Sequence, residues 1–246
     1  MTKKAEKDLL LRTFAAGILI VSALILMAVA LKHFSKPEPK SAEPVFGIDV
    51  SAHQGQIDWQ AVADSGVEFA MIRLGYRGYE TGSLHVDEYA RRNLESAKAA
   101  GLQVGAYFFS QAVTPQEARE EAALALQVLD GMALDLPLAY DWEYVTADAR
   151  TGSMDGETLL ACVDAFCTSL GDYQPMIYFN QELSRTLLDL EKVSQYPFWL
   201  AQYSEALDFP YPVQLWQYTD SGTVEGIQGP VDLNRRFPDI SDEAGA

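Results

Sequence analysis

The sequence predicts an α/β protein built as an irregular or truncated, TIM-like β/α barrel. From residue 45 onward, short apolar runs alternate with longer stretches of helical periodicity, which is the pattern of parallel β/α proteins. Several runs are apolar on both faces, as expected of strands that are covered on both sides. A complete eight-fold barrel needs about 250 residues and about 200 are available, so we expect an abbreviated version.

The N-terminal segment contains a predicted membrane anchor at residues 13–31. This run, TFAAGILIVSALILMAVAL, has no charged side chain. At 1.5 Å per residue it spans about 28 Å, close to the ~30 Å hydrocarbon core of a bilayer. Basic residues precede it, which places residues 1–12 in the cytoplasm and the rest of the chain outside. They are Lys3, Lys4, Lys7 and Arg12.

A cleaved signal peptide is the alternative to an uncleaved anchor. Residues 28–30, Ala-Val-Ala, resemble a small-residue cleavage site, although the apolar run is longer than usual for a signal peptide. Both interpretations export the domain that follows, either on a single-pass anchor in the cell membrane or as a secreted protein. Residues 32–44 contain three prolines and no apolar period, so they are predicted to form a semi-stiff linker before a single domain at 45–246.

Charge is distributed unevenly along the chain. The formal net charge is −17, and residues 41–246 carry 11 basic against 32 acidic side chains. Because a domain with this negative charge repels the phosphate backbone of nucleic acids, we expect no nucleic-acid partner. The alternative is that the excess of acidic residues only keeps the domain soluble. The domain is expected to act as a monomer.

Cysteine and histidine residues give no sign of a disulfide framework, a metal or a cofactor. Cys162 and Cys167 lie five positions apart on a predicted helix and point away from each other, so buried free thiols are expected. His53 and His85 lack the HxH or HExxH spacing of a metal site. His53 follows the first predicted strand and could form a hydrogen bond in a cleft or lie in solvent.

The order of strands and helices follows from the apolar runs and the helix boundaries. Thr114 and Pro115 form a favourable start for one helix, and Gly101 follows the end of another. Beyond residue 203 the pattern favours strands and turns without room for full helices. The predicted strands are residues 45–50, 69–75, 104–110, 136–142, 175–179, 198–203 and 213–218. The predicted helices are residues 58–65, 86–100, 115–130, 155–170 and 181–190.

Four acidic residues lie at or near predicted strand ends. Asp49 is near the end of the first strand, Asp141 and Glu143 end the fourth, and Asp232 lies in the segment GIQGPVDLN. Alternate side chains of a strand share a face, so Asp141 and Glu143 are expected about 6–7 Å apart on one side. Because chemistry gathers at the carboxyl ends of the strands in such folds, we expect all four acids at one rim.

A cleft lined by several acids fits the cleavage of a glycosidic bond. One protonated carboxyl group protonates the leaving oxygen, and a second group stabilises the transition state, activates water or acts as nucleophile. Neighbouring carboxylates and the apolar Trp142 are expected to raise the pKa of Glu143, which makes it the candidate acid. The alternative is that Asp141 and Glu143 only bind solvent or pair with Arg73.

Aromatic residues on the same strands are candidates for sugar binding. Sugar rings present apolar C–H faces that pack against aromatic rings. About half of these aromatic positions are expected to be structural, because strand aromatics also build cores. The candidate substrate-binding residues are Tyr76, Tyr107, Trp142, Tyr178, Trp199 and Tyr218.

Six motifs in this chain resemble, in the same order, those of glycoside hydrolase family 25, the Chalaropsis-type lysozymes. The resemblance covers residues 45–238 and implies an irregular β/α barrel. It also implies an N-acetylmuramidase that cuts the β-1,4 bond between N-acetylmuramic acid and N-acetylglucosamine in peptidoglycan glycan strands. The motifs are GIDVSAHQGQIDW, VEFAMIRLGYRG, GLQVGAYFF, LPLAYDWE, FWLAQY and LWQYTDSGTVEGIQGPVDLN.

The resemblance also assigns roles to the four acids. Glu143 matches the family's proton donor, and Asp141 matches the partner that steers the N-acetyl group or helps to stabilise the transition state. Asp49 and Asp232 match the remaining acids of the cleft. Tyr140 departs from the aliphatic residue of many relatives.

The expected role is remodelling or turnover of a bacterial cell wall by a membrane-tethered enzyme. No separate wall-binding repeat follows the catalytic domain, which fits an enzyme that its anchor holds at the wall. The alternatives are a peptidoglycan-binding module without turnover and a hydrolase of another N-acetylated glycan such as chitin.

Overall fold

A computed structural model describes residues 43–146 and 148–237 of the chain. The predicted cytoplasmic segment at 1–12, the predicted anchor at 13–31 and nearly all of the predicted linker at 32–44 lie outside the described residues. Within those described, no helix has both the length and the apolar character needed to cross a membrane.

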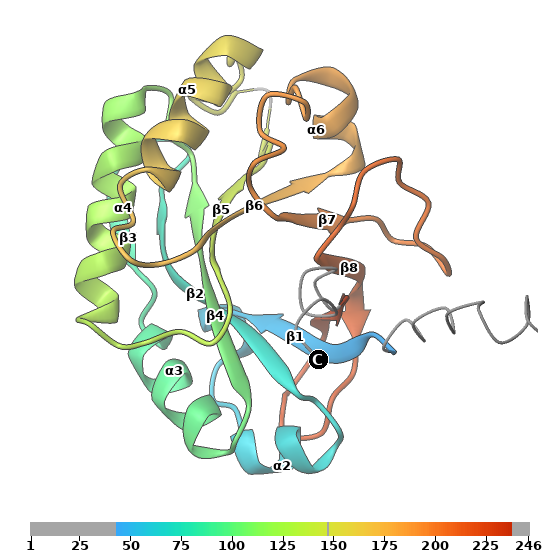
Figure 1. Cartoon of the computed structure of the whole chain (residues 1–246). Coiled ribbons are helices and arrows are strands. Elements are labelled where there is room, and N and C mark those ends of the chain that lie inside the picture. Colours follow the sequence, from blue (N-terminus) through green and yellow to red (C-terminus); the bar gives the residue numbers. More distant parts are fainter. Residues whose placement is uncertain (1–42, 147, 238–246) are drawn as a thin grey trace, which may run out of the picture. The chain divides into compact units, whose positions relative to one another are not determined.

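Eight strands in the described part of the chain close into a barrel (Figure 1). Around the barrel, β1 pairs with β2, the sheet continues through β4, β5, β6, β7 and β8 in parallel, and β9 closes it antiparallel to both β8 and β1. A short β3, Leu84–Val86, extends β2 as a hairpin. The barrel strands are β1 Val45–Val50, β2 Phe69–Arg77, β4 Gln103–Ser110, β5 Leu138–Trp142, β6 Pro175–Asn180, β7 Phe198–Ala201, β8 Leu215–Gly222 and β9 Val231–Arg236.

Helices cover the first part of the barrel and are absent from the last part. Figure 1 shows α3, α4 and α5 on the outside of the strands. Between the end of β7 and residue 237 the described chain contains no helix. This confirms the prediction of an irregular barrel, since the full alternation of strand and helix stops after β7. The helices are η1 Ala52–Gln54, α2 Trp59–Asp64, α3 Ala90–Ala99, α4 Pro115–Leu129, α5 Gly156–Cys167 and α6 Gln181–Thr186.

Strand alternation divides the apolar side chains into two cores. On β4, Phe108 points outward and packs in the core between barrel and helices, while Tyr107 points inward. The ring of Phe69 fills the space beside Gly47, where any β-carbon would collide with it. The core inside the barrel consists of Phe69, Met71, Tyr107, Leu136, Ala139, Met176, Tyr178, Trp199, Ala201 and Leu215.

Two elements differ from the sequence prediction. The helix predicted at 86–100 starts at Ala90, because the preceding residues form β3 and a turn. In that turn the Asp87 side chain accepts a hydrogen bond from the backbone N–H of Tyr89. Strand β9 was not predicted, since its inward positions carry Asp232 and Asn234 and so break the apolar run.

Several local predictions are confirmed. Thr114 caps α4 by accepting from the N–H of Glu117, and Pro115 is the first residue of that helix. Gly101 has a φ of 88° directly after the α3 C-cap, a conformation that favours glycine. Cys162 and Cys167 are buried free thiols.

Candidate active site

The four candidate acids come together in one pocket at the carboxyl ends of the parallel strands. Asp49 on β1, Asp141 on β5 and Asp232 on β9 point into the barrel mouth, and Glu143 directly follows β5. All four line a cavity of about 220 Å³. The structure thus brings together every acid that the sequence pointed to.

Strand alternation explains how β5 presents its two acids. Asp141 and Glu143 share the inward face, whereas Trp142 between them points outward. Trp142 is 1% exposed, and its indole N–H donates to the carbonyl oxygen of Ala112 at 3.3 Å. It packs in the core between barrel and helices, so the structure corrects the expectation that Trp142 contacts substrate.

Asp49 is held by two amide side chains. Its Oδ2 accepts hydrogen bonds from Gln217 Nε2 at 2.9 Å and from Asn234 Nδ2 at 2.7 Å. Gln217 in turn accepts from the hydroxyl groups of Tyr178 and Tyr203, each at 3.1 Å. Burial raises the pKa of Asp49, while the two amide donors oppose that rise by stabilising the carboxylate. Asp49 is therefore the cleft acid best prepared to carry a charge.

Asp232 lies beside Asp49 and is prepared to stay neutral. Burial, the charge of Asp49 and a hydrogen bond with Asp49 raise the pKa of Asp232 to about 9. The two residues are opposite each other in the antiparallel register of β1 and β9. Two carboxyl groups so placed cannot both ionise without strong repulsion, so a proton between them is the stable arrangement at neutral pH.

Glu143 and Asp141 form a second pair with raised pKa values. Burial and the charge of Asp49 raise the pKa of Glu143 to about 7, while a hydrogen bond with Asp141 opposes the rise. Burial and the charges of Glu143 and Asp49 raise the pKa of Asp141 well above its usual value, and Arg73 opposes this. A carboxyl group that titrates near pH 7 can donate a proton in neutral solution.

The backbone of Glu143 is fixed from behind by Gln111, which directly follows β4. Gln111 is fully buried, and its Nε2 donates to the carbonyl oxygen of Glu143 at 2.8 Å. Thr151 donates to Gln111 Oε1 at 3.0 Å, and Arg150 donates to the Gln111 backbone carbonyl at 3.2 Å. The loop that carries Glu143 is therefore tied to the end of the neighbouring strand.

The predicted aromatic residues divide between the pocket and other places. Tyr107, Tyr178 and Trp199 line the pocket, and the indole N–H of Trp199 donates to Asn234 Oδ1 at 2.8 Å. Tyr76 lines an adjoining groove instead. Tyr218 is not among the residues that line the pocket, because it packs beside Trp216 and under the Arg235 guanidinium.

Sequence reasoning missed the residues that organise the acids. Gln217 and Asn234 were not identified, although each is a polar residue at an inward position of a barrel strand. Asn234 lies two positions after Asp232 and therefore on the same face of β9. That spacing is the signal that could have found it, once β9 itself was recognised.

The side-chain amide groups of Gln217 and Asn234 donate to Asp49, whereas a bound cation would need oxygen ligands around it. Across residues 43–146 and 148–237, no three side chains of His, Cys, Asp and Glu are grouped so that they could hold a metal ion. Two N–H groups already occupy Oδ2 of Asp49. The arrangement is suited to proton transfer and charge stabilisation by carboxyl groups.

A family model described as "Glycosyl hydrolases family 25" matches residues 48–227, which is more than half of the chain. The chain belongs to glycosyl hydrolase family 25. Its eight-stranded irregular barrel is typical of family 25. The family resemblance seen in the motifs is thereby confirmed.

Two curated relatives illustrate the range of family 25. The chain is 34% identical over 202 residues to the uncharacterized protein YegX of Escherichia coli (strain K12), a match that covers 77% of this chain and 68% of YegX. It is 29% identical over 201 residues to the autolytic lysozyme of Clostridium acetobutylicum, which covers 76% of this chain and 54% of that protein.

The solved structure of a bacterial autolysin is similar to the barrel. The modular autolysin LytC from Streptococcus pneumoniae, determined in complex with a synthetic peptidoglycan ligand, has a TM-score of 0.69 and 28% sequence identity. The match covers 79% of this chain and 47% of LytC, so the chain spans about half of the length of that autolysin.

Proposed function

We propose that this protein is a lysozyme-type N-acetylmuramidase that cleaves the β-1,4 bond between N-acetylmuramic acid and N-acetylglucosamine in peptidoglycan. The observation that carries the proposal is the single pocket in which Asp49, Asp141, Glu143 and Asp232 meet. Membership in family 25 and similarity to an autolytic lysozyme and to the autolysin LytC support the same substrate class.

Glu143 is proposed as the general acid. Its pKa of about 7 leaves a large fraction of the carboxyl groups protonated at neutral pH. In cleavage the proton moves to the glycosidic oxygen while the bond from that oxygen to the anomeric carbon breaks. The leaving sugar then departs as a neutral alcohol rather than as a high-energy alkoxide.

Asp49 is proposed to stabilise positive charge that develops on the sugar ring, and Asp141 is proposed to position the N-acetyl group. Asp141 on β5 neighbours Glu143 and is only 5% exposed, and because burial raises its pKa well above the usual value it can donate a hydrogen bond as a neutral carboxyl group. Asp49 supplies the formal negative charge that its amide donors maintain. The neutral Asp232 can donate a hydrogen bond within the same pocket.

The central experiment is hydrolysis of peptidoglycan by purified protein with the substitution Glu143→Gln. The release of new reducing ends should fall by about 10²–10⁴-fold, because the amide retains the shape but has no proton to donate. Glu157→Gln, a substitution on the exposed side of α5, serves as the matched control and should retain wild-type activity. Neither variant should melt at a lower temperature than the wild type.

The outcome that contradicts the proposal is equally specific. If Glu143→Gln releases reducing ends as fast as the wild type, Glu143 is not the acid. If neither form cleaves the glycan and both bind it, the domain is a binding module. Faster cleavage of chitin than of muramic-acid-containing glycan would assign a different substrate.

We further propose that the protein works while attached to the outer face of the cell membrane, in wall turnover or remodelling. The support is the uncharged run at residues 13–31, with basic residues before it and a proline-containing segment after it. Signal-peptide cleavage would instead release a secreted enzyme.

A further inference from the structure

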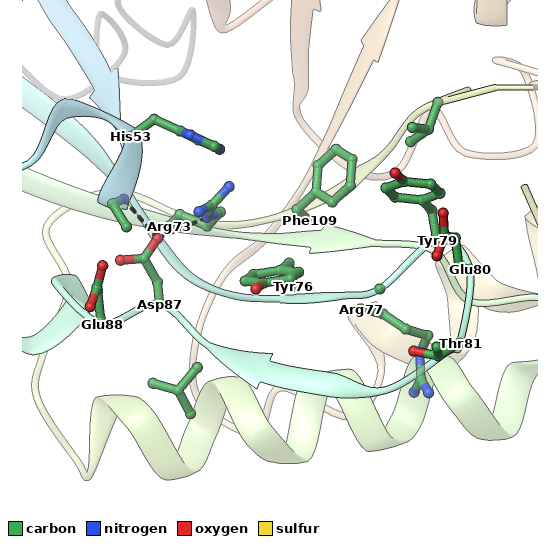
Figure 2. A pocket seen from close by; sticks show the side chains of 14 residues that line it. His53, Arg73, Tyr76, Arg77, Tyr79, Glu80, Thr81, Asp87, Glu88 and Phe109 are labelled. Carbon is green, nitrogen blue, oxygen red and sulfur yellow. Dashed lines mark hydrogen bonds and ion pairs between the residues drawn. The ribbon is translucent and has the colours of Figure 1, made fainter.

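A second cavity opens directly beside the catalytic pocket. It has a volume of about 850 Å³ and lies between the β2–β3 hairpin and the segments that follow β1, β4 and β5. We call it the hairpin groove. Its wall shares His53, Arg73 and Phe109 with the catalytic pocket, so the two are continuous. Figure 2 shows Arg73, Tyr76 and Tyr79 around this groove.

Exposed apolar side chains gather along the hairpin groove. Tyr79 is 41% exposed, Val86 51% and Val145 37%, and all three line it. Among the described residues, the remaining large apolar side chains with such exposure are Tyr144 and Tyr203, and Tyr203 lines the catalytic pocket. Apolar groups left in water beside a catalytic pocket mark a binding surface rather than a random feature.

Arg73 stands at the junction of groove and pocket with part of its hydrogen-bonding capacity unused. Its Nε donates to Asp87 Oδ2 at 2.9 Å, and Asp87 is itself fixed by the backbone N–H groups of Ala52 and Tyr89. No residue in the described part of the chain accepts a hydrogen bond from the two terminal nitrogens of Arg73. In Figure 2 these nitrogens project between His53 and Phe109.

The neighbouring Arg77 shows what a fully used guanidinium looks like in this fold. Its Nε, Nη1 and Nη2 all donate, to Glu121, the carbonyl of Gly82 and the carbonyl of Glu117 respectively. Figure 2 shows Arg77 directed away from the groove. The open nitrogens of Arg73 are therefore a specific property of that position, in a side chain that is only 12% exposed.

The chemistry of the groove favours a peptide over additional sugar rings. The ring of Tyr76 stacks on His85 at 4.8 Å, and the Arg73 guanidinium lies over it at 5.2 Å, so this ring is a poor platform for a sugar. A fixed guanidinium with two free terminal nitrogens matches a carboxylate. The sugar ring and N-acetyl group carry no charge, whereas peptides attached to muramic acid contain carboxylates.

We infer that the hairpin groove binds the peptide that muramic acid carries on its lactyl group, with Arg73 pairing with a carboxylate of that peptide. This inference rests on the proposed muramidase function and adds to it a recognised part of the substrate. Tyr79, Val86 and Val145 contact the small apolar side chains of the peptide, while the sugar occupies the acid-lined pocket. The groove thus selects glycan that still carries its peptide.

The test compares two soluble tetrasaccharides of the peptidoglycan repeat, one with acidic peptides and one with the same peptides amidated at their carboxyl groups. Wild type should cleave the acidic form with about tenfold higher kcat/KM, mainly through a lower KM. In Arg73→Gln that preference should disappear. Because both substrates meet the same catalytic acids, any effect of Arg73 on the acids cancels in the ratio.

Two further variants keep the test decisive. Arg91→Gln removes an exposed cation on α3 and should keep the tenfold preference. Tyr79→Ser should raise the KM for both peptide-bearing substrates severalfold and leave the KM for peptide-free glycan unchanged. An unchanged acidic preference in Arg73→Gln, or equal losses of Tyr79→Ser on peptide-free glycan, would overturn the inference. If wild type cleaves none of the glycans, the muramidase proposal fails instead.

Discussion

At the scale of single residues, the cleft buries several carboxyl groups whose ionised form would be more stable in water. Burial is the largest influence on the pKa of Asp49, Asp141, Glu143 and Asp232, and in each case it raises the pKa. A group that resists ionisation in the folded protein lowers the stability of the fold as the pH rises. The acids that equip the site for chemistry therefore act against the stability of the domain.

The substitution Asp232→Asn should make the domain more stable in mildly alkaline solution. The pKa of Asp232 is about 9 in the folded protein and 3.8 in its unperturbed form. Between these values the folded chain holds a proton that the unfolded chain has lost, so wild-type stability falls as the pH rises. Asparagine cannot ionise and can still donate to Asp49, so the variant escapes this loss.

Thermal melting at several pH values checks this prediction. The variant should melt a few degrees above wild type at pH 8, and the difference should shrink as the pH falls to 3, where the carboxyl group is largely protonated in both states. Asp172→Asn, a substitution on the exposed surface, should show no such divergence. A variant that melts below wild type at pH 8 would show that the Asp232 carboxylate stabilises the fold.

Much of the site at this scale could be predicted, and the failures have one cause. Strand ends and family motifs pointed to all four acids, which the structure places in a single pocket. Trp142 was predicted to contact substrate because it is aromatic. It lies between Asp141 and Glu143 in the sequence, however, so the alternation of side chains along the strand turns it outward. Gln217 and Asn234 were missed because their role depends on pairing with Asp49, and sequence order does not reveal such pairing.

At the scale of elements, Arg77 fastens the β2–β3 hairpin to helix α4. The guanidinium bonds the carbonyl of Gly82 on the hairpin side and Glu121 on the helix, and Glu121 also accepts from Ser110 of β4 at 2.6 Å. The Ser110 hydroxyl also forms a hydrogen bond with the hydroxyl of Tyr140 on β5 at 2.8 Å. Tyr140 thus completes a buried polar chain across two barrel strands.

Removing that fastening should cost much of the stability. Arg77→Met leaves the buried Glu121 and two partly buried backbone carbonyls without their donor, which should lower the free energy of unfolding by about 3–5 kcal/mol. The pKa of Glu121 is already about 7 because burial raises it, and loss of Arg77 removes an opposing charge. The destabilisation should therefore be larger at pH 9, where Glu121 ionises, than at pH 5.

Urea unfolding at the two pH values measures this effect. Arg91→Met, which breaks an exposed pair with Glu95 on α3, should leave the free energy of unfolding close to that of the wild type and provides the control. The double substitution Arg77→Met with Glu121→Gln should abolish most of the difference between pH 5 and pH 9. Equal free energies of unfolding for Arg77→Met and wild type would show that Arg77 does not stabilise the packing of the β2–β3 hairpin against α4.

Most elements were predictable because their apolar period and caps are local signals. Helix α4, with its Thr114 cap and Pro115, starts at the predicted residue. The elements that were missed, β3 and β9, are short or carry polar inward residues, and they exist because of partners elsewhere in the chain. Strand β3 pairs with β2, and β9 pairs with β1 and β8. The periodicity of apolar residues is a local signal, so it cannot predict strands that form because of such non-local pairing.

At the scale of the whole molecule, the barrel closes with a strand of reversed direction. The seven strands before β9 in the barrel run parallel, and β9 joins the last of them to β1 in antiparallel pairing. This arrangement needs fewer residues than a further strand and helix, which is why a chain shorter than a complete β/α barrel can still close. The length of the sequence predicted an abbreviated barrel but not the way in which it closes.

The proposed membrane tether predicts how the whole protein behaves in cells. The full chain should sediment with membranes and resist extraction with high salt, because an uncharged run of about 19 residues is held by burial in hydrocarbon. Protease added to spheroplasts should digest the domain from outside. A chain that begins at residue 33 behind a cleavable signal should be recovered in the medium, and its recovery in the membrane fraction would contradict the tether.

The hydrogen bond from Asn234 to Asp49 joins residues 185 positions apart. During synthesis, β1 leaves the ribosome long before β9, so for most of that time Asp49 lacks its amide partner and Asp232 does not yet exist. The pocket of four acids is therefore complete only after the C-terminal strand β9 has joined the barrel. Chains that end before β9 should therefore lack the proposed activity, because they lack both Asp232 and the amide group that holds Asp49.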